Sequence, residues 1–223
     1  MTILLTGFEP FDGGTVNPSR EIARALDGRE IAGMNVRSRV YPVSLARIAG
    51  AVRTAIEETR PSLIVSLGLA GGEPMIRLER IGANLADFET ADNDGVLQKD
   101  EPLVPGGPDA VAATLPMRAI RDALLGAGIP ARLSNSAGLY LCNACLYHTG
   151  MMVKETRANA RFGFIHLPYL PEQAALLLAD PKNARQPERF ASMALETMLR
   201  AVETAIAVSL QSNVSRPRAA SRS

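Results

Sequence analysis

The segment GLYLCNACLYHTG, residues 138–150, contains both cysteines of the chain and one of its two histidines. Thiol and imidazole groups are the side chains from which proteins build redox pairs, metal sites and nucleophilic catalysts. Cys142, Cys145 and His148 lie in this segment, and the second histidine, His166, ends the apolar run FGFIH. Three kinds of chemistry are therefore open.

A thiol redox pair is the first possibility, because Cys142 and Cys145 form a C-x-x-C motif. In thioredoxin-like proteins this motif lies where a strand ends and a helix begins, and the expected position here agrees with that. The motif usually occurs in much shorter chains, with residues other than Asn143 and Ala144 between the cysteines. A redox pair is therefore an alternative interpretation.

A zinc site is the second possibility, and the chain offers only Cys142, Cys145, His148 and His166 as soft ligands. Side chains on a helix advance by about 100° per residue, so His148 points about 120° away from Cys142. Four ligands would not converge on one metal ion without breaking the helix. We expect no metal and no cofactor.

The third possibility needs a single thiol. Cys142 is expected in the first turn of a helix, where free backbone N–H groups and the positive end of the helix dipole favour the thiolate. Cys145 lies one turn further on, beside Leu146, and is expected in the core. Cys142 is therefore the candidate nucleophile for attack on a carbonyl carbon.

A nucleophilic cysteine needs a histidine to move its proton. His148 is expected to face away on the same helix, whereas His166 ends an apolar strand just before Pro168. Strand ends and the helix N-termini that follow them share one edge of an open parallel sheet, so Cys142 and His166 can meet there. A packing role for His166 stays open as the alternative, because spacing alone does not exclude it.

Short apolar runs alternate with helical patterns along the chain, which predicts an α/β fold with a mostly parallel sheet. Strands are predicted at 2–7, 62–72, 131–137 and 161–168. Helices are predicted at 17–26, 44–60 and 115–128, from about residue 140, and at 187–208. The stretch 77–103, rich in Asp, Asn and Gly, predicts strands or a hairpin at the edge of the sheet.

Two glycine-containing loops were considered as phosphate sites. GFEPFDGGT follows a predicted strand and precedes a predicted helix, but it has no Lys and carries Glu9 and Asp12 where an anion would bind. GLAGG lacks the spacing of a dinucleotide-binding turn. We interpret both loops as tight turns.

Composition and charge limit the partners. Hydrophobic residues make up 47% of the 223 residues, and 24 Lys and Arg against 23 Asp and Glu give a formal charge of +1, so neither nucleic acid nor a membrane is expected as a partner. The first apolar run stops at Gly7, too early for a signal peptide or a membrane span, and predicts a cytoplasmic protein. We expect one domain over residues 1–208 and a basic, disordered tail over 209–223.

Four motifs in order resemble the pyrrolidone-carboxylate (pyroglutamyl) peptidases, a family of cysteine peptidases. They are GFEPFDGGTVNPS, LERIGANLADFETADNDG, SNSAGLYLCNACLY and GFIHLPYLPEQ, and together they cover about residues 3–173. The resemblance implies a single three-layer α/β/α domain, assembled as a homotetramer or homodimer. It also implies hydrolysis of peptides with an N-terminal pyroglutamate, without a cofactor.

The resemblance further implies a Cys-His-Glu triad, with Cys142 as nucleophile, His166 as general base and then acid, and Glu79 as the carboxylate that orients the imidazole. Without the resemblance, Glu79 between Arg77 and Arg80 would be interpreted as part of a solvated face. The resemblance assigns Phe8 and Phe11 to the walls of a slot for the lactam ring. Asn17, before Pro18, is expected to cap the next helix and to hold this loop in place.

Three residues depart from the family pattern. Leu69, Leu139 and Glu89 stand where the family usually has Gln, Thr and Arg, and the changes remove polar groups near the expected site. Because the triad is retained, a working peptidase is the favoured hypothesis. A binding protein that has lost turnover and a C-x-x-C redox protein are the competing hypotheses.

Overall fold

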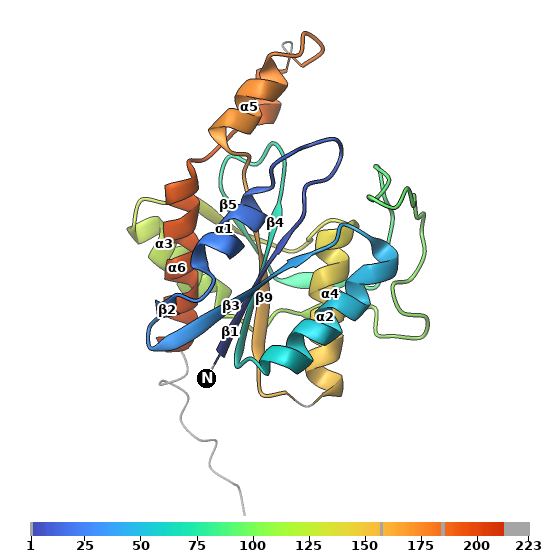
Figure 1. Cartoon of the computed structure of the whole chain (residues 1–223), viewed down its shortest axis with the longest axis vertical. Helices are drawn as coiled ribbons and strands as arrows, with labels where there is room; N and C mark the ends of the chain where they lie inside the picture. Colours follow the sequence, from blue (N-terminus) through green and yellow to red (C-terminus); the bar gives the residue numbers. More distant parts are fainter. Residues whose placement is uncertain (1, 157, 184–185, 212–223) are drawn as a thin grey trace, which may run out of the picture.

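A seven-stranded sheet with strand order β2-β3-β1-β4-β9-β5-β8 crosses the centre of the molecule (Figure 1). The computed structural model describes residues 2–156, 158–183 and 186–211. Most neighbouring strands run parallel, whereas β2 is antiparallel to β3 and β5 is antiparallel to β9. The bounds are β1 Thr2–Phe8, β2 Glu30–Ile31, β3 Met34–Tyr41, β4 Leu63–Leu69, β5 Ile76–Glu79, β8 Ala131–Ser134 and β9 Arg161–Leu167.

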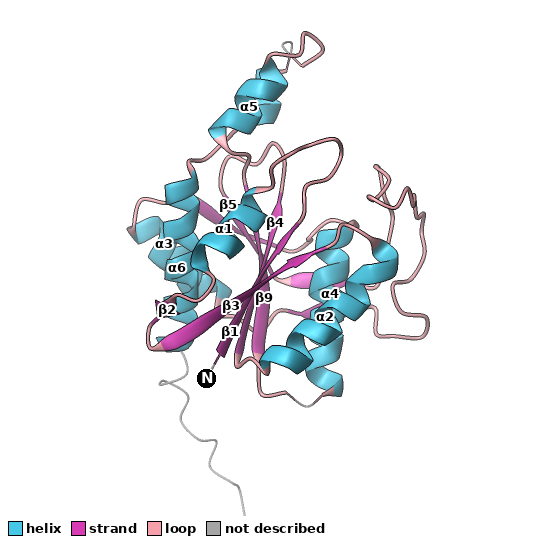
Figure 2. Ribbon diagram, viewed as in Figure 1, coloured by secondary structure: helices cyan, strands magenta, loops and turns pink. Residues whose placement is uncertain are grey.

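Helices cover both faces of this sheet. Figure 2 shows α1, α3 and α6 on one side and α2 and α4 on the other. Their bounds are α1 Pro18–Leu26, α2 Leu45–Thr59, α3 Met117–Gly126, α4 Leu141–Glu155, α5 Pro171–Leu178 and α6 Leu195–Gln211. The short strands β6 Ile81–Ala83 and β7 Ala110–Ala112 form a separate two-stranded sheet. The predicted three-layer α/β/α architecture is confirmed.

The central strands are buried on both faces, which explains why they are continuous apolar runs. In β9 the alternation of side chains sends Ile165 and Leu167 to the core under α3 and α6, and Phe162 and Phe164 to the core under α2 and α4. His166 follows this alternation onto the α4 side of the sheet. The register of β9 therefore places His166 beside α4.

The predicted strands and the first four predicted helices are confirmed, whereas β2, β7 and α5 were not predicted and three further features differ. Strand β3 was not predicted, because its sequence MNVRSRVY is polar on one face near the sheet edge. Strand β5 lies inside the sheet between β9 and β8, not at its edge, and most of 84–103 is loop. The predicted helix 187–208 was wrong at its start, where a 3₁₀ turn at Pro187–Phe190 precedes α6.

Helix α6 continues to Gln211, with Ser209 buried. Residues 212–223, most of the predicted tail, lie outside the described residues, so that assignment stays a prediction. Within the described part of the chain, no helix is long and apolar enough to cross a lipid bilayer.

The loop between β1 and α1 is fixed by Asn17, as predicted. Its side-chain oxygen accepts hydrogen bonds from the backbone N–H of Ser19 at 3.1 Å and from the Ser19 hydroxyl at 2.7 Å. Its amide donates to the carbonyl of Glu9 at 3.0 Å. Asn17 is 1% exposed, so it satisfies one helix end and one loop carbonyl away from water.

Gly7 and Gly50 give opposite predictions for the same substitution. A Cβ on Gly7 would overlap the backbone carbonyl of Ser19, whereas a Cβ on Gly50, inside α2, meets nothing. We expect Gly7→Ala to lower the free energy of unfolding by about 3 kcal/mol. Gly50→Ala should raise it by up to about 1 kcal/mol, because Ala has the higher helix propensity. Urea unfolding of both variants checks this, and equal effects would contradict the close packing of α1 on β1.

Candidate active site

His166 lies near the end of β9 and is 5% exposed. In the register of the sheet it is opposite Gly68 on β4 and Arg77 on β5. The two neighbouring strands therefore place a residue without a side chain, Gly68, and a polar residue, Arg77, opposite His166. The structure brings His166 to the same face of the sheet as the start of α4.

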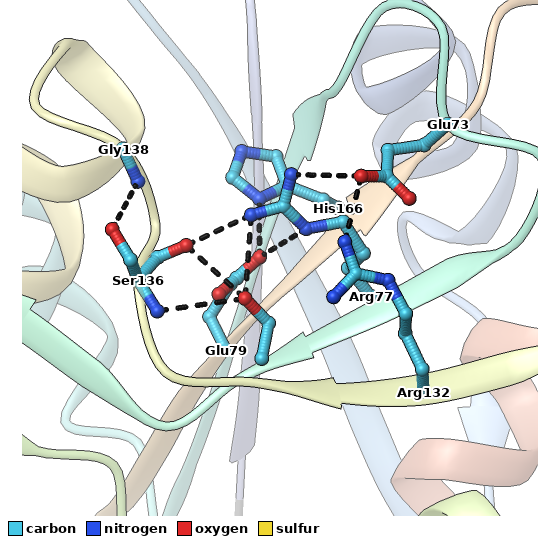
Figure 3. Close-up of polar contacts among 8 residues, drawn as sticks. Glu73, Arg77, Glu79, Arg132, Ser136, Gly138 and His166 are labelled. Carbon is cyan, nitrogen blue, oxygen red and sulfur yellow. Dashed lines mark hydrogen bonds and ion pairs between the residues drawn. The ribbon is translucent and has the colours of Figure 1, made fainter.

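Glu79 reaches His166 diagonally across the antiparallel pair of β5 and β9. Its Oε1 lies 2.8 Å from Nδ1 of His166, and its side chain is fully buried (Figure 3). Ile76 and Leu78 point to the opposite face, so alternation along β5 puts Glu79 on the α4 side. The interpretation of Glu79 as part of a solvated face was wrong.

Arg77 compensates the buried carboxylate, and sequence reasoning did not select it for this role. Its Nε lies 3.0 Å from Oε1 of Glu79, and its Nη1 lies 3.2 Å from Oε1 of Glu73. Its Nη2 donates to the carbonyl of Ser136 at 2.8 Å and to the hydroxyl of Ser134 at 3.3 Å. The i, i+2 spacing of Arg77 and Glu79 on one strand face was the available signal.

These contacts keep Glu79 ionised. Burial by itself raises the pKa of Glu79, but the hydrogen bond and electrostatic attraction of His166, followed by Ser134 and Arg77, lower it below its usual value of 4.5. With the carboxylate accepting, Nδ1 of His166 carries the proton and Nε2 is the basic nitrogen. The imidazole is thus held in the tautomer that can accept a proton.

Cys142 lies in the first turn of α4, as predicted. Its Sγ would be 2.7 Å from a Cβ added to Gly68, so the thiol occupies space that the missing side chain of Gly68 leaves free. The first hydrogen bond along the helix backbone is from Ala144 N to Tyr140 O. The N–H groups of Leu141, Cys142 and Asn143 precede it and have no partner within the helix.

The expectation of a lowered pKa for Cys142 was wrong. Burial raises the pKa of this thiol, and Cys145 and Glu79 add to the rise, while Arg77 and the backbone N–H of Cys142 oppose it. The loss of hydration outweighs the helix dipole. Cys142 is therefore a thiol in the resting site and needs a base to become a nucleophile.

The side chain of Asn143 attaches the start of α4 to β6. Its Oδ1 accepts from the N–H of Ala83 at 2.8 Å, and its Nδ2 donates to the carbonyls of Ala83 and Leu85, both at 2.9 Å. Sequence reasoning treated Asn143 only as a spacer between two cysteines. Asn143 is 1% exposed, and buried amides are almost always hydrogen-bonded, but no pattern in the sequence indicated this role.

A cavity of about 430 Å³ connects these groups. Cys142 and His166 both line it, and so do the predicted binding residues Phe8, Phe11 and Asn17. Tyr140 adds a third aromatic wall, with its ring centroid 6.0 Å from that of Phe11. The lining is mostly apolar, with a few polar and charged side chains, which suits a small neutral ring.

Cys145 and His148 are not in this cavity. Cys145 is fully buried in the core under α4, and burial raises its pKa to about 12. His148 lines a different cavity with Leu103, and burial lowers its pKa. Among the described residues no cluster of His, Cys, Asp or Glu could hold a metal ion. Of the four residues that the sequence offers as zinc ligands, the structure thus brings Cys142 and His166 to one cavity, buries Cys145 and places His148 in a different cavity.

The three departures from the family pattern lie in different places. Leu69 and Glu89 line the cavity. Leu139 is half-buried, and its carbonyl accepts a hydrogen bond from the N–H of Asp87 at 3.2 Å. Only two of the three changes therefore alter the cavity wall.

The pKa of Glu79 gives a pH-dependent prediction. Because the folded-state pKa lies below the usual value, ionised Glu79 stabilises the fold at neutral pH, and this contribution is lost as the pH falls through the folded-state pKa. We expect Glu79→Gln to lower the free energy of unfolding by about 2 kcal/mol near pH 7. The difference from the parent chain should shrink as the pH is lowered from 7 to below the usual carboxyl pKa of 4.5.

Urea unfolding across this pH range makes the test. Glu58→Gln is the control, since Glu58 pairs with Arg39 at the surface and its loss should change the free energy of unfolding by less than about 0.5 kcal/mol. A difference for Glu79→Gln that is independent of pH would mean that the charge of Glu79 does not contribute.

Comparison with known proteins agrees with this geometry. The model of a family described as pyroglutamyl peptidase matches residues 1–212. The pyrrolidone-carboxylate peptidase of Klebsiella pneumoniae (strain 342) is 44% identical over 213 residues, which are 95% of this chain and 94% of that one. The one from Thermococcus onnurineus (strain NA1) is 42% identical over 211 residues, covering 95% of this chain and 100% of that one.

Solved structures are similar over the same extent. A mutant pyrrolidone carboxyl peptidase from Pyrococcus furiosus superimposes with a TM-score of 0.90 at 40% identity, covering 96% of this chain and 100% of that one. Another structure of pyrrolidone carboxyl peptidase from Pyrococcus furiosus superimposes with a TM-score of 0.89 at 41% identity, and the match covers 95% of this chain and 99% of that one. The chain, with its cysteine, histidine and aromatic cavity, belongs to the pyroglutamyl peptidase family.

Proposed function

We propose that the chain is a cysteine exopeptidase that hydrolyses the amide bond after an N-terminal pyroglutamate, with Cys142, His166 and Glu79 as its catalytic triad. The observation that carries the proposal is the buried hydrogen bond between Glu79 and His166 on the wall of the cavity that Cys142 also lines. Membership of the pyroglutamyl peptidase family supports the reaction type. No cofactor or metal takes part in the proposed steps.

In the first step, Nε2 of His166 removes the proton of the Cys142 thiol as Sγ attacks the pyroglutamyl carbonyl carbon. The raised pKa of Cys142 makes this proton transfer a necessary part of the attack. The carboxylate of Glu79 stabilises the imidazolium that forms. The tetrahedral intermediate collapses when His166 protonates the departing amine, which leaves a pyroglutamyl thioester on Cys142.

In the second step, water attacks the thioester and His166 again accepts a proton. Sγ leaves, and the thiol of Cys142 is restored as pyroglutamate departs. The oxyanion of both intermediates needs hydrogen-bond donors, and the free N–H groups at the start of α4 are suited to this. Backbone donors of this kind do not depend on the Arg that Glu89 replaces.

The walls of the cavity suit pyroglutamate itself. Phe8, Phe11 and Tyr140 supply flat apolar surfaces for the five-membered ring. The lactam is neutral, so its binding needs no counter-charge in the inner part of the cavity. Asn17 holds the Phe8–Phe11 loop through its contact with Glu9, and we assign it a positioning role in substrate binding.

The two competing hypotheses predict other behaviour. A redox protein would form a reversible disulfide between Cys142 and Cys145 and would lose its function when either cysteine is replaced. A binding protein without turnover would be stabilised by a pyroglutamyl aldehyde and would release no product. Because the hydrogen bond between Glu79 and His166 is present, it supports the hypothesis of an active peptidase over that of a protein that only binds pyroglutamyl peptides.

Hydrolysis of a pyroglutamyl fluorogenic amide by the purified protein, under reducing conditions, tests the proposal. We expect the parent chain and Cys145→Ser to release the fluorophore, and Cys142→Ala to be slower by at least about 1,000-fold. Cys145→Ser is the matched control, because it changes the other thiol of the same helix. Full activity of Cys142→Ala, or loss of activity on adding a chelator, would contradict the mechanism.

A homotetramer or homodimer in the cytoplasm is also part of the proposal. Helix α5 stands apart from the layered body (Figure 1), and it carries Leu176 at 74% exposure and Leu178 at 37%. A large exposed leucine on a projecting helix supports contact with a second copy of the chain.

Substitution of Leu176 tests the assembly. We expect Leu176→Asp to shift the sedimentation coefficient toward that of the monomer, because an isologous contact loses the same side chain twice. Leu97→Asp is the control, since Leu97 is 53% exposed on the 84–103 loop, away from α5. A parent chain that sediments as a monomer would contradict the proposed assembly.

A further inference from the structure

The charge of the cavity is not balanced. Among the described residues that line it, the charged side chains are those of Arg77 and Glu89. Arg77 is already engaged by the carboxylates of Glu79 and Glu73. Glu89 has no ion pair or hydrogen bond with any residue that the structure describes. One free negative charge therefore lies on the wall of the cavity that contains Cys142.

Three other carboxylates of the same loop have partners, whereas the exposed Asp100 and Glu101 form no ion pair within the described part of the chain but do not line this cavity. Asp87 pairs with Lys99 at 3.1 Å, and Asp94 pairs with Arg47 at 2.9 Å. Asp92 is buried and accepts hydrogen bonds from three backbone N–H groups. Glu89 differs from these neighbours because it is exposed and has no such contact. Its carboxylate is free for a ligand.

A second exposed carboxylate lies near the mouth of the cavity. Asp12 is on the loop between β1 and α1, next to Phe11, and it lines a neighbouring cavity that shares Phe11 and Leu69 with the first. Burial is the main reason that the pKa of Tyr140 is raised to about 12, and the charge of Asp12 contributes. Asp12 also has no ion pair within the described part of the chain.

The position of Glu89 indicates which part of a substrate it meets. Phe8 and Asn17 are 3% and 1% exposed and form the inner wall, whereas Glu89 is exposed. An exopeptidase holds the N-terminal residue inside, and the rest of the peptide must leave through the open side. The pyroglutamyl ring is neutral, so the first side chain that can carry a charge is that of the second residue.

We propose that Glu89, assisted by Asp12, makes this site selective for pyroglutamyl peptides whose second residue is Lys or Arg. The proposal rests on the peptidase activity proposed above. A flexible ammonium or guanidinium group gains an ion pair with Glu89 at the rim, while an acidic second residue meets like charge. The contact is present in both the ground state and the transition state, so it acts mainly through KM.

Three substrates that differ only in the second residue test the proposal: pyroglutamyl tripeptide amides with Lys, Ala or Glu there. We expect kcat/KM to fall about threefold from Lys to Ala and about threefold again from Ala to Glu, as exposed ion pairs of this kind give. High salt should reduce the difference, because it screens exposed charges. Chromatography of the released dipeptide amide measures all three rates.

Charge-removing variants separate Glu89 from the rest of the protein. Glu89→Gln should bring the ratio of kcat/KM for the Lys substrate to kcat/KM for the Glu substrate close to one. Addition of Asp12→Asn should remove any remaining preference for Lys. Asn is suitable at residue 12 because it tolerates the left-handed backbone there, where φ is 53°. Glu30→Gln is the matched control, an exposed carboxylate on the edge strand β2 that should leave the ratio unchanged.

The outcomes distinguish this proposal from the proposed function. Hydrolysis of all three substrates at equal rates would overturn the selectivity and leave the peptidase intact. No hydrolysis of any of them would overturn the peptidase itself. Faster cleavage of the corresponding Pro tripeptides, which have a free N-terminal ammonium, would overturn the assignment of Glu89 to the second residue, because its partner would then be the amino terminus.

Discussion

The active site depends on one buried ion pair, in which Glu79 is held between Arg77 and His166. A carboxylate without solvent access is costly unless charged and polar partners surround it. The sheet supplies these partners through register alone: Arg77 is two residues away on the same strand face, and His166 is across the antiparallel pair. The antiparallel direction of β5 brings Glu79 to the diagonal position from which it reaches Nδ1.

The thiol is placed by a different part of the fold. Helix α4 begins where Gly68 leaves space over the sheet, and Asn143 ties this helix end to β6. Burial then raises the pKa of the Cys142 thiol, so in the proposed mechanism this thiol has to transfer its proton to His166 before or during attack. In that mechanism Glu79 stabilises the imidazolium that forms.

In the proposed function, the cavity separates recognition of the ring from recognition of the rest of the peptide. Its aromatic walls are uncharged and suit the lactam, whereas its open side carries the free carboxylate of Glu89. Glu89, which stands where the family usually has Arg, alters the charge of the cavity wall and forms no hydrogen bond or ion pair with the proposed triad of Cys142, His166 and Glu79. If both proposals hold, selectivity and catalysis can vary independently in this chain.

The sequence by itself determined the α/β class, the strand that ends at His166, the helix that starts near Cys142 and the cap at Asn17, because each follows from local periodicity and residue type. It also separated Cys142 from Cys145 by their positions on one helix. Only the tertiary structure decided that Glu79 is buried, that Arg77 compensates it, and that Cys142 is a thiol at rest. Those properties depend on pairing between distant strands and on loss of hydration, and neither leaves a periodic signal in the sequence.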